Sequence, residues 1–130
     1  MTVKPGVAWL MLAEAVSLAV MSTLHLTGRL NDGHAAVYQP SAAGIAEAII
    51  GAVLFAAGVV ALVAPNQARP VAVAATSFAI VGFAIGITMT IRGGSAADIA
   101  YHATVLPILL GTLGLVLRSG ANSPRLAARE

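Results

Sequence analysis

Three polar side chains stand inside long apolar stretches of the sequence. They are His25, Glu47 and His102, and each lies near one end of its stretch. If the stretches are antiparallel helices, all three fall in one layer near the same end. Two imidazoles and a carboxylate suit zinc, iron or copper, and two facing histidines can hold a haem. The set predicts a site for a divalent metal, a haem or a lipophilic ligand, with interfacial histidines that contact water and head groups as the alternative.

Further polar residues fall at the same depth and are predicted to surround this site. Asp98 is four residues before His102, a spacing that would let its carboxylate orient the imidazole. Ser95 and Asp98 also match a capping box at the start of a helix, so both roles stay open for Asp98. Tyr101 and Thr88 complete the predicted surroundings.

Another ionisable group, Glu14, lies in the first apolar stretch, eleven residues before His25. Eleven steps of about 100° bring both residues to one helix face, about 16 Å apart along the axis. An ionisable side chain inside a membrane span costs about 2.5–3.5 kcal/mol on insertion scales, so we expect Glu14 to be neutral. Its predicted hydrogen-bond partner is Ser77 or Thr112. A working proton carrier is the alternative role.

The segment Leu12-Ala13-Glu14 is similar to the first-helix segment of the small multidrug-resistance transporters, which also have four spans. The resemblance covers one helix, and it implies proton-coupled exchange at Glu14. Members of that family line their pockets with aromatic residues of the later helices. The second and third stretches here have only Phe55, Phe78 and Phe83 as aromatic residues, so no other residue is carried over.

Composition identifies the elements that must position these residues. Charged residues are 9% of the 130-residue chain, against about 25% in soluble domains, which leaves too little polar surface for a soluble globule. Apolar stretches at 7–27, 41–64, 71–91 and 97–117 are each long enough to cross a bilayer, which takes about 20 residues. We predict one all-α integral membrane domain, with four transmembrane helices in an up-down bundle. Ser41 is a predicted helix cap, 65–70 a connector and 118–130 a polar tail.

Other function classes are excluded by the same composition. The chain has no cysteine, which removes disulfides, thiolate metal sites and iron–sulfur clusters. Its net charge of +2 is small, so the sequence predicts no nucleic-acid partner. No nucleophile elbow, phosphate loop, zinc-protease helix or dinucleotide fingerprint is present, so any enzyme of this sequence would act on a lipophilic molecule.

Basic residues predict the orientation in the membrane. One side would hold Lys4, Arg69, Arg118, Arg125 and Arg129, and the other side Arg29 and Arg92. Because cytoplasmic loops carry the excess of Lys and Arg, both termini are predicted to be cytoplasmic in a multi-pass protein of the cell inner membrane. The His25 and His102 layer would then lie in the outer half of the bilayer.

Small residues on the second stretch indicate a close helix contact. Gly44, Gly51 and Gly58 share one side of this helix, and such residues let helices approach closely in lipid. The contact is either inside the bundle or with a homo-oligomer partner or a larger membrane complex. Three function classes stay open: a protein that binds a metal, haem or lipophilic ligand, a proton-coupled transporter that uses Glu14, and a structural or accessory subunit.

Overall fold

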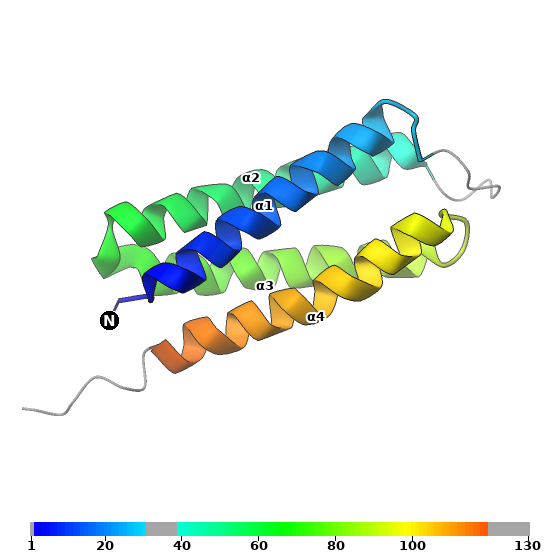
Figure 1. Cartoon of the computed structure of the whole chain (residues 1–130). Coiled ribbons are helices and arrows are strands. Elements are labelled where there is room, and N and C mark those ends of the chain that lie inside the picture. Colours follow the sequence, from blue (N-terminus) through cyan, green and yellow to red (C-terminus); the bar gives the residue numbers. More distant parts are fainter. Residues whose placement is uncertain (1, 31–38, 120–130) are drawn as a thin grey trace, which may run out of the picture.

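The chain forms four antiparallel helices in an up-down bundle (Figure 1). The computed structural model describes residues 2–30 and 39–119. The helices are α1 (Pro5–Leu26), α2 (Pro40–Val63), α3 (Pro65–Thr90) and α4 (Ala96–Ser119). The predicted all-α fold with four spans is therefore confirmed. Most of the first predicted loop and of the predicted tail, including Arg125 and Arg129, lies outside the described residues.

Proline sets where three of the helices begin. Pro5, Pro40 and Pro65 each occupy the first turn, where the missing N–H has no partner to lose and the fixed φ already suits a helix. The prediction that Ser41 caps α2 is wrong, because Gln39 holds the cap position and Pro40 begins the helix.

The prediction of a connector at 65–70 is also wrong. These residues are the first turns of α3, and Ala64 alone separates α2 from α3. Pro70 lies inside α3 and Pro107 inside α4, and both helices continue through them. The polar, proline-rich composition of 65–70 marks a helix start, which composition alone does not distinguish from a loop.

Helix neighbours follow one another around a ring. Within the described residues, α1 packs on α2, α2 on α3 and α3 on α4, while the backbones of the diagonal pairs stay farther apart. The contact of α1 with α2 is the most extensive, and the contact of α1 with α4 is the least. We call the end where α1 ends and α4 begins the distal end. The proximal end is where α1 begins and α4 ends (Figure 1).

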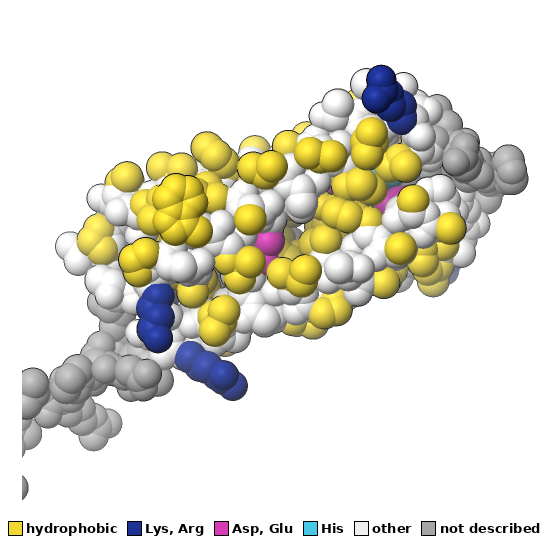
Figure 2. All heavy atoms as spheres, viewed as in Figure 1, with side chains coloured by type: hydrophobic (Ala, Val, Ile, Leu, Met, Phe, Trp, Pro, Cys, Tyr) yellow, Lys and Arg dark blue, Asp and Glu magenta, His cyan; other side chains and the backbone are white. Residues whose placement is uncertain are grey.

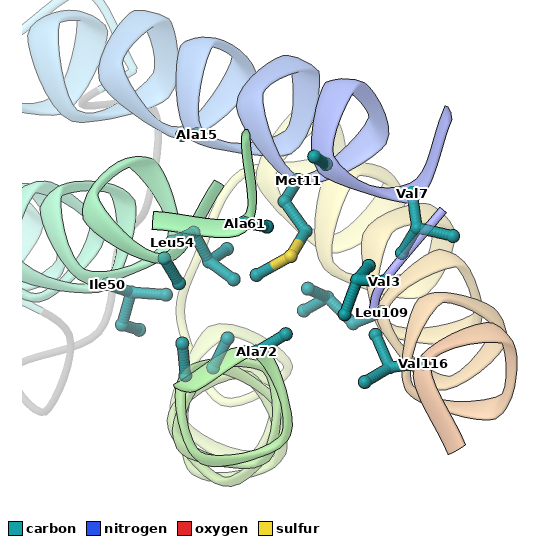
Figure 3. Close-up of a cluster of buried hydrophobic side chains, with 14 of the residues drawn as sticks. Val3, Val7, Met11, Ala15, Ile50, Leu54, Ala61, Ala72, Leu109 and Val116 are labelled. Carbon is teal, nitrogen blue, oxygen red and sulfur yellow. The ribbon is translucent and has the colours of Figure 1, made fainter. Parts of the chain in front are cut away.

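The proximal half has an apolar core to which all four helices contribute. Met11 of α1 is fully buried, and Figure 3 shows its side chain pointing between Leu54, Ala72 and Leu109 of the other three helices. Val3 and Val7 close the core at its proximal end. Most of the buried polar side chains lie farther along the bundle, toward the distal end.

Apolar side chains also cover the outside of the bundle. Trp9, Val63 and Ile91 are all more than half exposed. Figure 2 shows hydrophobic side chains along the flank, with lysine and arginine at the two ends. All four helices are long and apolar enough to cross a bilayer, since even the 22 residues of α1 extend about 33 Å. The chain is a multi-pass membrane protein whose apolar flank faces lipid.

Three glycines of α2 bring this helix close to α1. A Cβ at Gly44 would lie 3.1 Å from the carbonyl oxygen of Ser22, and one at Gly58 would lie 3.3 Å from that of Ala8. A Cβ at Gly51 would lie 3.2 Å from Cβ of Leu18. The predicted small-residue face of α2 is thus used inside the bundle, against α1.

Candidate functional site

His25 and Glu47 meet across the close contact of α1 with α2. Nδ1 of His25 lies 2.7 Å from Oε2 of Glu47, and both side chains are buried. Gly44 allows this approach, because a Cβ there would lie only 3.0 Å from Cβ of His25. In the same region, the Ser22 hydroxyl of α1 donates a hydrogen bond of 2.7 Å to the Gly44 carbonyl oxygen, which holds the backbone of α2 against α1.

Asp98 of α4 joins both histidines. Its Oδ2 lies 3.5 Å from Nε2 of His25, and its Oδ1 lies 3.1 Å from Nδ1 of His102. His102 Nδ1 also lies 3.0 Å from the backbone carbonyl oxygen of Asp98. A carbonyl oxygen only accepts, so Nδ1 carries the proton and Nε2 of neutral His102 is an acceptor. We call His25, Glu47, Asp98 and His102 the distal cluster.

Three members of the distal cluster have the geometry to share one ion. His25, Glu47 and Asp98 each offer a ligand atom, these atoms lie within 4.8 Å of one another, and all three residues are buried. His102 is held on Asp98 at the edge of this group. The sequence predicts His102 as a ligand and Asp98 as its support, and the geometry adds Asp98 to the residues that could bind an ion. Both imidazoles approach the carboxylate of Asp98.

Asp98 also keeps its role at the start of α4. Its backbone N–H donates to Ser95 Oγ over 3.2 Å, which is half of the predicted capping box. One residue therefore helps to begin the helix and places a carboxylate between two histidines. The two roles that the sequence left open for Asp98 are compatible.

Thr88 does not reach the cluster, contrary to its predicted place. It is exposed, and its hydroxyl donates to the Ile85 carbonyl of its own helix. Thr90 takes the inward position and is buried, because two residues along a helix turn the side chain by about 200°.

Tyr101 lies beside the cluster and contacts it through its ring. The Tyr101 and His102 ring centroids are 6.0 Å apart in an edge-on arrangement, and Phe83 of α3 packs against both rings. The Tyr101 hydroxyl lies 3.1 Å from Ser17 Oγ of α1. Tyr101 thus supports the His102 ring and links α4 to α1.

Glu14 forms a separate, smaller polar contact nearer the proximal end. The Thr112 hydroxyl donates to Glu14 Oε1 over 2.6 Å, so of the two predicted partners the structure selects Thr112. Among the described residues, Glu14 Oε2 has no hydrogen-bond partner and no lysine or arginine pairs with Glu14. Acidic side chains are visible between α1 and α4 in Figure 2.

A cavity of about 330 Å³ opens beside the distal cluster, between α2 and α3. Glu47 and His102 lie in its wall, and most of its other lining residues are apolar. The sequence predicts a ligand site at Glu47 and His102 but not the position of this cavity, because most of its wall is alanine, glycine and large apolar residues that also suit lipid contact.

No protein-family model matches this chain, and no curated protein or solved structure is similar enough to match. The function is therefore inferred from the geometry of the distal cluster and of the cavity.

Proposed function

We propose that this protein binds a divalent transition-metal ion at the distal cluster. The observation that carries the proposal is the convergence of one imidazole and two carboxylates, all buried, from α1, α2 and α4. Imidazole and carboxylate together suit zinc or ferrous iron, and buried charged groups are normally paired or coordinate a metal. His102, which shares the Asp98 carboxylate, would orient that ligand as an outer-shell partner.

Charge supports a divalent ion in particular. Glu47 and Asp98 bring two carboxylates into a buried site, and no lysine or arginine of the described residues pairs with Glu47. A divalent ion balances both charges while the two imidazoles stay neutral, which is the form in which histidine binds metals. Among the described residues, Glu14 has no other carboxylate or histidine near enough to form a second group of this kind.

The orientation is part of the proposal. With both termini cytoplasmic, the distal cluster and the adjacent cavity lie in the outer half of the cell membrane. Single cysteines at Gln67 and Arg92 test this in a chain that has no other cysteine, since both positions are exposed at opposite ends of the bundle. A membrane-impermeant thiol reagent should label position 92 from outside and not position 67. The reverse pattern would invert the orientation.

Zinc binding by the full chain tests the proposed function. The purified protein is equilibrated with Zn²⁺ in detergent, and bound zinc is measured by elemental analysis. We expect one zinc per chain, and Asp98→Asn should lower the affinity by at least about tenfold, since even outer-shell changes cost 10–100-fold. Glu14→Gln is the matched control, because it alters a buried carboxyl group outside the cluster in the same way.

The outcomes separate the remaining function classes. Equal zinc binding by Asp98→Asn and the wild-type chain, or no zinc binding by either, would contradict the proposal. Proton release on substrate binding that requires Glu14 and does not require zinc would favour the proton-coupled transporter. If the protein is stable only when it is purified together with a larger membrane complex, and if it binds no zinc, the accessory-subunit function would be favoured.

A further inference from the structure

The cavity beside the distal cluster lies between two lipid-facing helices. Its volume of about 330 Å³ is within the range of small-molecule sites, which are mostly apolar with a few placed polar groups. Its walls include Ala43 and Ala46 of α2 and Ile85 and Met89 of α3. A molecule that enters from the bilayer would meet apolar side chains first.

The polar groups of the cavity wall include two hydrogen-bond acceptors. Glu47 uses Oε2 for His25, and its Oε1 has no partner among the described residues although Glu47 is only 3% exposed. His102 uses Nδ1 for Asp98, and its acceptor Nε2 faces Gly86, where a Cβ would lie 2.8 Å away. Glycine at position 86 keeps this nitrogen uncovered. A ligand that satisfies these atoms must donate hydrogen bonds.

A second cavity along the same two helices provides a comparison. It lies in the proximal half, and its wall consists of alanine, valine and phenylalanine residues only, among them Ala56, Ala57 and Phe78. Lipid chains can fill such a hollow without loss of any hydrogen bond. The distal cavity differs because its wall contains Glu47 and His102, and a lipid chain offers no hydrogen bond to either side chain.

We propose that the distal cavity binds a lipophilic alcohol, with its hydroxyl donating to Glu47 Oε1 or His102 Nε2 and its apolar body between α2 and α3. The ligand must be a hydrogen-bond donor because two polar atoms of the wall, Glu47 Oε1 and His102 Nε2, are both acceptors. The neutral head group rests on the proposed function, because a divalent ion already balances Glu47 and Asp98 and leaves no charge for an ammonium group.

Photolabelling of the full chain in lipid nanodiscs tests this inference. The probe is a long-chain alcohol with a diazirine in its chain, and its methyl ether, which cannot donate, is the chemical control. We expect the alcohol to label the cavity segments of α2 and α3 with up to about tenfold higher affinity than the ether, the order expected for one ordinary hydrogen bond. Labelling by both probes alike would overturn the inference without any mutation.

Two matched substitutions on α2 locate the site. Ala46→Phe fills the distal cavity and should abolish the alcohol labelling, while Ala56→Phe fills the proximal cavity and should leave it unchanged. Persistent labelling in Ala46→Phe would contradict the site. A long-chain primary amine that competes better than the alcohol would contradict the neutral head group.

Zinc measured on the same samples distinguishes the two proposals. Neither alanine is in the distal cluster, so both variants should bind zinc as the wild-type chain does. Loss of alcohol labelling with zinc retained supports the cavity assignment. Selective alcohol labelling of a protein that binds no zinc would support the cavity assignment and contradict the proposed metal site.

Discussion

The two interfaces of α1 are built in different ways. Toward α2, Gly44, Gly51 and Gly58 bring the backbones together, and α1 has its most extensive contact there. Toward α4 the helix contact is the least extensive in the ring. Three side-chain contacts cross that interface instead: His25 with Asp98, Ser17 with Tyr101, and Glu14 with Thr112.

This difference separates scaffold from site. Lipid chains are as apolar as leucine, so helices in a bilayer associate through close packing and hydrogen bonds rather than the hydrophobic effect. The α1–α2 interface uses close packing and fixes His25 against Glu47. The α1–α4 interface uses polar contacts and brings Asp98 of α4 to His25 and Glu47. The third ligand of the site therefore comes from α4.

The close interface should be the most sensitive to change. In Gly44→Val the new Cβ would lie 2.9 Å from Leu26 Cγ and 3.1 Å from the Ser22 carbonyl oxygen, so α2 must move away from α1. We expect a loss of about 3 kcal/mol in the free energy of unfolding, the upper end for overpacking, together with loss of zinc binding. Unfolding in a denaturing detergent measures the first effect.

Gly111→Ala is the control for that substitution. A Cβ at Gly111 meets nothing within 4 Å, and alanine favours the helix by about 0.5–1 kcal/mol over glycine. The variant should be as stable as the wild-type chain or slightly more so. Similar losses in both variants would show that glycine at position 44 is not needed for close approach.

Removal of Glu14 should have the next largest effect. Glu14→Ala leaves the buried Thr112 hydroxyl without its partner and should cost about 1–3 kcal/mol. Glu14→Gln keeps a carbonyl acceptor for Thr112 and should retain most of the stability. Thermal unfolding in detergent checks both. If Glu14→Gln folds normally but abolishes a proton-linked activity, Glu14 is a proton carrier.

The contact of Ser17 with Tyr101 should contribute least. We expect Tyr101→Phe and Ser17→Ala to cost about 0.5–1.5 kcal/mol each. A double-mutant cycle should give a coupling of about 0.6 kcal/mol, the usual value between membrane helices. Zero coupling would show that the hydroxyls do not hold α4 against α1.

The sequence predicts the helices and the layers of polar residues, but not which polar residues pair. The helices follow from apolar length, since lipid requires a backbone that satisfies its own hydrogen bonds. His25 and Glu14 share a face through helical periodicity alone. The depth of Thr88 follows from its place in the sequence, but the direction of its side chain depends on the rotation of α3, which its packing on neighbouring helices determines.

The central place of Asp98 could not be predicted from the sequence. Its position four residues before His102 indicated their contact, but its approach to His25 depends on the rotation of α4 against α1. The cavity depends on the relative position of α2 and α3, which no local pattern of residues encodes. These are properties of tertiary packing rather than of periodicity.

X-ray absorption at the zinc edge of the loaded, full-length protein tests the central claim most directly. The distal cluster predicts a first shell of nitrogen and oxygen ligands at about 2.0–2.2 Å, with the outer-shell scattering of an imidazole ring. Asp98→Asn should weaken binding or alter that shell, and Glu14→Gln should leave the spectrum unchanged. A shell of oxygen ligands without imidazole scattering, or identical spectra for Asp98→Asn and the wild-type chain, would contradict a metal ion at the distal cluster.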